Sequence, residues 1–139
     1  MKDKGDEFYK NKDYYSAINA YSTAYRSNSS LLACLSNRAA CFLNLFNYEE
    51  CLYDSDVLIE VYKKDKEEKY FPLYLKAILR RAICYAWKGA LDDSKNIFEE
   101  LLLIAVEVDE STLKEEYTTQ CKLALILLTR RQESNQFKR

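Results

Sequence analysis

The side chains whose types and spacing suggest chemistry are two polar pairs, each four residues apart. Lys2 and Asp6 form one pair, and Lys76 and Arg80 form the other. Residues four apart lie on the same face of an α-helix. Lys and Arg donate charge-assisted hydrogen bonds to carboxylates, whereas an ionised Asp only accepts hydrogen bonds. The pattern indicates a local site for an acidic ligand, provided that the fold brings the two pairs together.

Other reactive residue types do not form a catalytic or metal-binding pattern. The chain has no histidine and no CxxC pair; its five cysteines are Cys34, Cys41, Cys51, Cys84 and Cys121. Zinc sites and Cys–His catalysis therefore lack the partners they need. All five cysteines fall in apolar helical patterns, so we interpret them as small buried hydrophobic residues in a reducing compartment. We expect no cofactor, no metal and no enzymatic activity.

Composition favours long helices in one domain. Of the 139 residues, 48% are hydrophobic and 31% are charged, with only two glycines and one proline. The net charge is -1, from 21 basic and 22 acidic residues, which argues against nucleic acid as a partner. The first residues lack the apolar core of a signal peptide, and the longest apolar run, 101–106, is too short for a bilayer. We expect a cytoplasmic protein with no membrane partner.

A repeated pattern places these side chains on helices. Small residues at Gly5, Ala39 and Ala82 are separated by 34 and then 43 positions, that is, one 34-residue period and the same period with nine extra residues. Three residues later an aromatic follows each: Phe8, Phe42 and Tyr85. Twelve residues after the first small residue comes a second: Ala17, Cys51 and Ser94. Small residues let two antiparallel helices approach closely, and the aromatics fill the space beside the crossing. The sequence therefore predicts three helical hairpins.

The expected elements follow from apolar spacing and turn residues. We expect helices at 2–10, 13–27, 31–45, 47–64, 70–88 and 90–107, with the insertion lengthening the helices around it. A seventh helix should begin near Asp109, with Thr112 and Glu115 as a capping box. The predicted organisation is a domain at 1–129, with repeats at about 1–31, 32–65 and 75–108, an insertion at 66–74, a capping helix at about 110–129, and a fraying polar tail at 130–139. The sequence begins at the fourth position of the 34-residue pattern, so the first repeat lacks its first three positions. We therefore also expect a longer protein around this segment.

This pattern resembles a tetratricopeptide repeat (TPR) domain, which implies an all-α, right-handed α-solenoid of three TPR helix pairs plus a C-terminal capping helix. In that family the first helix of each pair forms the inner wall, on which this sequence places Lys2, Asp6, Asn37, Lys76 and Arg80. The set is similar to the two-carboxylate clamp of TPR co-chaperones, which binds the C-terminal peptide of Hsp90 or Hsp70. The family pattern has Asn where this sequence has Asp6. About 4 Å from a bound carboxylate, Asp6 would oppose binding by about 1 kcal/mol in water and about 4 kcal/mol at an effective dielectric of 20.

A closer resemblance is to the TPR domains of axonemal dynein assembly co-chaperones. It is carried by Leu35–Cys41, by the pair Asp54 and Ser55, by the insertion and by Lys76–Arg81. The resemblance implies a role in dynein preassembly, although other TPR families share part of the same run.

Other interpretations of the same residues stay open. Lys76 and Arg80 also suit a solvated helix face, and Asn37 suits repeat packing. The alternative function is a TPR scaffold that binds a different peptide or a partner helix, with the clamp weakened by Asp6. Five tyrosines exceed what the repeat pattern demands and would serve such a surface or the core: Tyr9, Tyr15, Tyr25, Tyr62 and Tyr74.

Overall fold

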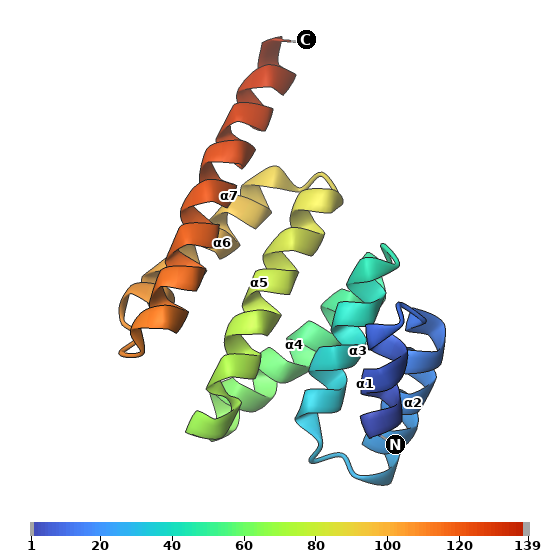
Figure 1. Cartoon of the computed structure of the whole chain (residues 1–139). Helices are drawn as coiled ribbons and strands as arrows, with labels where there is room; N and C mark the ends of the chain where they lie inside the picture. The colour runs from blue at the N-terminus through green and yellow to red at the C-terminus, as the bar shows by residue number, and fades with distance from the viewer. Residues whose placement is uncertain (1, 138–139) are drawn as a thin grey trace. The chain divides into compact units, whose positions relative to one another are not determined.

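Helices account for most of the computed structural model, which describes residues 2–137 (Figure 1). They are α1 (Lys2–Lys10), α2 (Tyr14–Ser27), α3 (Leu32–Asn44), α4 (Tyr48–Asp65), α5 (Phe71–Trp87), α6 (Leu91–Val106) and α7 (Ser111–Phe137), with a short 3-10 helix at Glu68–Tyr70. No strand occurs between residues 2 and 137. The six helices predicted before α7 are confirmed, and each of their ends lies within one residue of its predicted position.

The protein divides into two compact units. The first extends to Cys84 and holds α1 to α4 with most of α5; the second begins at Tyr85 and holds α6 and α7. In the first unit α1 packs on α2, α2 on α3 and α3 on α4, whereas in the second α6 packs on α7. Within the described range, no helix has the length and apolar character needed to cross a membrane.

The helical hairpins turn at positions that recur with the sequence period. Lys12, Phe46 and Gly89 all have positive φ, of 61°, 60° and 88°. They are 34 and 43 positions apart, the same intervals that separate Gly5, Ala39 and Ala82. A left-handed residue just after a helix ends the helix and reverses the direction of the backbone. The repeat therefore has a shared backbone geometry as well as a shared pattern of side chains.

The small residues of the pattern lie where the helices meet. Ala17, Ala39, Cys51, Ala82 and Ser94 have no exposed surface. Gly5 is also buried, and an added Cβ would come within 2.5–2.9 Å of three atoms of the Tyr21 ring. An apolar stripe on α2 packs in the same cluster, since Ala17, Tyr21 and Ala24 are buried there and Ile18 and Tyr25 pack against them. Close helix approach thus depends on the small side chains, as predicted.

A buried ion pair ties three helices of the first unit together. Arg38 on α3 donates to both oxygens of Asp54 on α4, from Nε at 2.8 Å and from Nη2 at 2.6 Å. Its Nη1 donates to the Ser22 hydroxyl on α2 at 3.0 Å. The Asp54 side chain is only 1% exposed, and the pair raises the pKa of Arg38 above its ordinary value. Two parallel charge-assisted bonds fix the spacing of α3 and α4.

All five cysteines are free thiols in the core, as predicted. Burial raises the pKa of Cys41 and of Cys121 to about 11.

The insertion at 66–74 does more than lengthen the helices on either side of it. The helix α4 ends where Lys66 adopts a left-handed conformation, and a 3-10 turn precedes α5. Tyr62 stacks on Tyr74 across this break, with ring centroids 4.4 Å apart.

The second unit differs from the prediction at both ends of α7. The capping box of Thr112 and Glu115 is wrong, because the Glu110 carboxylate accepts from the backbone N–H groups of Thr112 at 3.0 Å and Leu113 at 2.8 Å. The helix was predicted to end near 129 with a fraying tail, but it continues through Phe137. Gln132 on this extension bonds to α6, accepting from Lys95 and donating to Asp92. These contacts hold the extension in place.

Candidate anion-binding site

A polar cavity of about 290 Å³ lies in the first unit. It is lined from α1, α2, α3 and α5 by Asp6, Tyr9, Tyr21, Asn37, Ala40, Lys76 and Arg80. Four of the five predicted site residues line it, and the fifth, Lys2, forms an ion pair with Asp6. The helical spacing explains this arrangement, because residues four apart share one face of α1 and of α5. The fold thus brings the two polar pairs together.

The α1 end of the cavity is a compact hydrogen-bonded group. Lys2 Nζ donates to Asp6 Oδ2 at 3.0 Å, and the Tyr21 hydroxyl donates to Asp6 Oδ1 at 2.6 Å. The bond from Tyr21, with a smaller contribution from Lys2, lowers the pKa of Asp6 below its ordinary value. Asp6 in turn raises the pKa of Lys2, and burial together with the bond to Asp6 raises the pKa of Tyr21. Both carboxylate oxygens of Asp6 therefore have partners within the protein.

The α5 end of the cavity is basic. Arg80 Nη1 donates to the backbone oxygen of Ser36 at 2.8 Å and to its hydroxyl at 2.9 Å. Ser36 is buried in α3, so it fixes the position of the guanidinium. Lys76 is exposed one turn earlier, and neither it nor Asn37 forms a side-chain hydrogen bond or ion pair with any residue that the structure describes. Asn37 and Lys76 have polar groups that a ligand could use.

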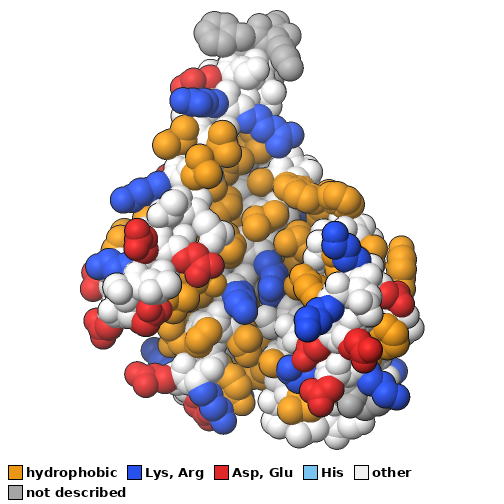
Figure 2. All heavy atoms as spheres, viewed as in Figure 1, with side chains coloured by type: hydrophobic (Ala, Val, Ile, Leu, Met, Phe, Trp, Pro, Cys, Tyr) orange, Lys and Arg blue, Asp and Glu red, His pale blue; other side chains and the backbone are white. Residues whose placement is uncertain are grey.

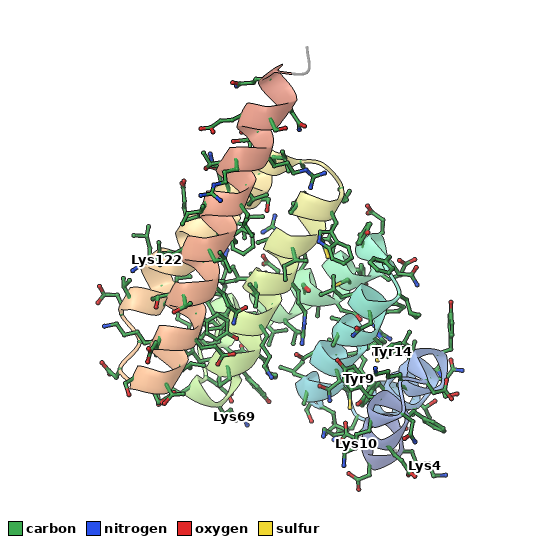
Figure 3. The ribbon with its side chains drawn as sticks, turned by 45° about the horizontal axis from the view of Figure 1, so that its top comes forward. Lys4, Tyr9, Lys10, Tyr14, Lys69 and Lys122 are labelled. Carbon is green, nitrogen blue, oxygen red and sulfur yellow. The ribbon has the colours of Figure 1, made fainter. Side chains whose placement is uncertain are left out.

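Tyr9 forms part of the cavity wall and is fixed by two neighbours. Its ring meets that of Tyr14 edge to face, with centroids 5.5 Å apart, where α1 turns into α2 (Figure 3). Its hydroxyl accepts a hydrogen bond of 3.4 Å from Asn44 on α3. The sequence marked Tyr9 only as one tyrosine beyond the repeat pattern. Its role in the cavity follows from the position of α1 against α3, which no local pattern reveals.

Two further residues of the site have roles that the sequence pattern did not indicate. The ring of Tyr21 is buried in the core, and its hydroxyl also donates to Asp6. Ser36 stood out only as part of the run Leu35–Cys41, yet it positions Arg80. A hydroxyl at an otherwise apolar helix position was the available signal in both cases, because a buried hydroxyl needs a hydrogen-bond partner.

Charge around the site is mixed. Figure 2 shows acidic and basic side chains intermingled over α1 and α2 rather than a single basic surface. In the cavity, one carboxylate on α1 stands with two cations on α5. Such an arrangement suits a small acidic group at the α5 end. It is not the continuous basic surface that binds the phosphate backbone of a nucleic acid. Among residues 2–137, no group of three His, Cys, Asp or Glu side chains could hold a metal ion.

Curated proteins resemble parts of this sequence. It is 39% identical over 61 residues to dynein axonemal assembly factor 4 of Pongo pygmaeus, a match that covers 44% of the chain and 14% of that protein. It is 32% identical over 80 residues to Hsp70-Hsp90 organizing protein 2 of Arabidopsis thaliana, covering 58% of the chain and 14% of that protein. The matches span 8–14% of the length of the first curated relatives. No protein-family model matches.

A solved structure resembles most of the protein. The second TPR domain of the human RPAP3 protein, in complex with the HSP70 peptide SGPTIEEVD, matches with a TM-score of 0.64 and 26% identity. The match covers 87% of this protein and 91% of that domain. The predicted all-α TPR fold class is confirmed.

Proposed function

We propose that this protein, a TPR domain of the co-chaperone type, is an adaptor that binds the acidic C-terminal peptide of Hsp70 or Hsp90. The observation that carries the proposal is the cavity in which Asn37, Lys76 and Arg80 converge from α3 and α5. The peptide bound by the similar RPAP3 domain is acidic, with three carboxylate side chains in nine residues. Because the similar RPAP3 domain binds a peptide, we propose binding rather than enzymatic activity for this site.

The basic end of the cavity supplies the attraction. Lys76 and Arg80 carry positive charge, and Asn37 offers amide donors without charge. A hydrogen bond to a charged group contributes about 1.5–3 kcal/mol. Because Ser36 already orients Arg80, less side-chain freedom is lost when a ligand binds. Three such bonds together contribute about 4.5–9 kcal/mol, part of which offsets the freedom lost on association.

The cellular role that we propose follows from the relatives. Dynein axonemal assembly factor 4 is 39% identical over the matched segment, and Hsp70-Hsp90 organizing protein 2 is 32% identical. An adaptor that brings a cytoplasmic chaperone to axonemal dynein during preassembly fits both names. The site residues in this proposal are Lys2, Asp6, Asn37, Lys76 and Arg80.

A second candidate, a scaffold for a different partner, is favoured by two exposed tyrosines. Tyr15 on α2 and Tyr53 on α4 are 70% and 69% exposed. In contrast, Tyr74 is buried and stacks on Tyr62, and Tyr25 packs against the core cluster. Tyr15 and Tyr53 are therefore the residues that a scaffold function would use.

The direct test is a fluorescence titration with the labelled peptide Ser-Gly-Pro-Thr-Ile-Glu-Glu-Val-Asp. We expect micromolar binding that weakens about tenfold in Lys76→Ala and in Arg80→Ala. Lys4→Ala is the matched control, because Lys4 is an exposed lysine on α1 that does not line the cavity. Equal binding by all of these variants would refute the site, and loss of binding in Tyr15→Ala or Tyr53→Ala would favour the scaffold.

A further inference from the structure

We infer that this site recognises acidic side chains rather than the terminal carboxylate of a peptide backbone, so that its partners include proteins with an internal acidic segment. The inference rests on the proposed function, because it concerns the ligand of the same cavity. It follows from the difference between the two ends of the cavity. The α1 end repels a carboxylate, and the α5 end offers positive charge and hydrogen-bond donors to one.

At position 6 the α1 end presents a carboxylate instead of a hydrogen-bond donor. Asp6 projects into the cavity, and an ionised carboxylate accepts hydrogen bonds but donates none. Its Oδ1 already accepts from Tyr21 and its Oδ2 from Lys2. A second carboxylate placed here would face a like charge instead of an N–H group.

Lys2 does not offset this repulsion. Its ammonium group lies 3.0 Å from Asp6, one turn away on the same helix, so the two side chains together carry no net charge. Asp6 is held toward Lys2 by Tyr21, a residue of α2 that is 1% exposed and packs against Gly5. The pair is thus fixed beside the packing between α1 and α2, and Lys2 itself does not line the cavity.

The α5 end keeps its capacity for a carboxylate. Lys76 is exposed and Asn37 forms no side-chain hydrogen bond within the described residues, while Ser36 sets the orientation of Arg80. The carboxylate of a Glu or Asp residue can reach these groups from any position in a peptide, whereas a backbone carboxylate exists only at the C-terminus. The site therefore selects for acidic side chains, and a free C-terminus adds little.

The test compares three labelled peptides on the whole protein by fluorescence polarisation. The first is Thr-Ile-Glu-Glu-Val-Asp with a free C-terminus, the second is the same peptide amidated, and the third continues with Gly-Ser-Gly-amide, so that its carboxylates are all on side chains. We expect the three dissociation constants to agree within about threefold. A peptide with Gln in place of both Glu residues should bind at least about tenfold more weakly.

Asp6→Asn is the variant that tests the cause. An Asn side chain still accepts from Tyr21 but also offers an N–H to the cavity and no longer neutralises Lys2. This variant should prefer the free C-terminus over the amide by more than about threefold. If the wild-type protein itself loses more than about threefold on amidation, or if Asp6→Asn gains no preference, the inference is wrong while the proposed function stands. If none of the peptides binds, the proposed function fails and the inference fails with it.

Discussion

The Tyr21 hydroxyl donates a 2.6 Å hydrogen bond to Asp6, across the same helix pair in which the Tyr21 ring packs on Gly5. One buried side chain therefore both packs between α1 and α2 and orients the carboxylate that lines the cavity. The hydrogen bond from Tyr21 orients Asp6 and lowers the pKa of Asp6. The properties of the site are therefore coupled to the packing of the first repeat.

Tyr21→Phe tests the hydrogen bond without disturbing the ring packing. We expect the free energy of unfolding at pH 7 to fall by about 1 kcal/mol, since Asp6 is partly exposed and its bonds are weakened by solvent. Because the folded-state pKa of Asp6 is lowered, its contribution is present above the ordinary carboxyl pKa of about 3.9 and is lost as the pH falls from there through the lowered folded-state pKa. Urea unfolding of both proteins at a series of pH values from neutral to strongly acidic measures this. A difference between the two proteins that does not change across the series would show that the hydroxyl acts through something other than Asp6.

Gly5→Ala tests the close approach of the helices. Alanine is the better helix former by about 1 kcal/mol, yet its Cβ would overlap the Tyr21 ring. We expect net destabilisation of about 1–2 kcal/mol. Glu7→Ala is the control, as Glu7 is exposed on the same helix. A Gly5→Ala protein as stable as wild type in thermal unfolding would mean that α1 does not pack on Tyr21 as described.

The buried pair of Arg38 and Asp54 should behave as a unit. Arg38→Met removes one partner and leaves a carboxylate of 1% exposure without its cation, which should cost about 3–5 kcal/mol. The double variant Arg38→Met, Asp54→Leu removes both charges, and we expect it to recover most of that loss. A double-mutant cycle from denaturant unfolding gives the coupling energy. Additive effects of the two substitutions would contradict the pairing.

The repeat was predictable from sequence because small and aromatic residues recur at matched intervals. Gly5, Ala39 and Ala82 marked the helix crossings, and the turns at Lys12, Phe46 and Gly89 recur at the same intervals. The period of each repeat also sets which side chains share an inner wall. The resemblance to TPR domains implied which side chains face that wall, and four of these residues, from three helices, line one cavity.

Contacts made by the tips of long side chains were not predictable. Whether the Tyr21 hydroxyl reaches Asp6, or Arg80 reaches Ser36, depends on the angle and distance between helices that pack in three dimensions. The same reason explains the errors at α7. The Glu110 carboxylate caps the first turn of α7 in place of Thr112, and Gln132 bonds to α6 and so supports a polar segment that was expected to fray.

The most direct test of the central claim, that an acidic peptide binds the cavity between α1, α3 and α5, is an NMR titration of the ¹⁵N-labelled protein with Ser-Gly-Pro-Thr-Ile-Glu-Glu-Val-Asp. The account predicts that the largest amide shifts cluster around Asn37, Lys76 and Arg80, and that Lys76→Ala needs about tenfold more peptide to reach them. Shifts that cluster instead around Tyr15 and Tyr53, or no shifts at millimolar peptide, would contradict it.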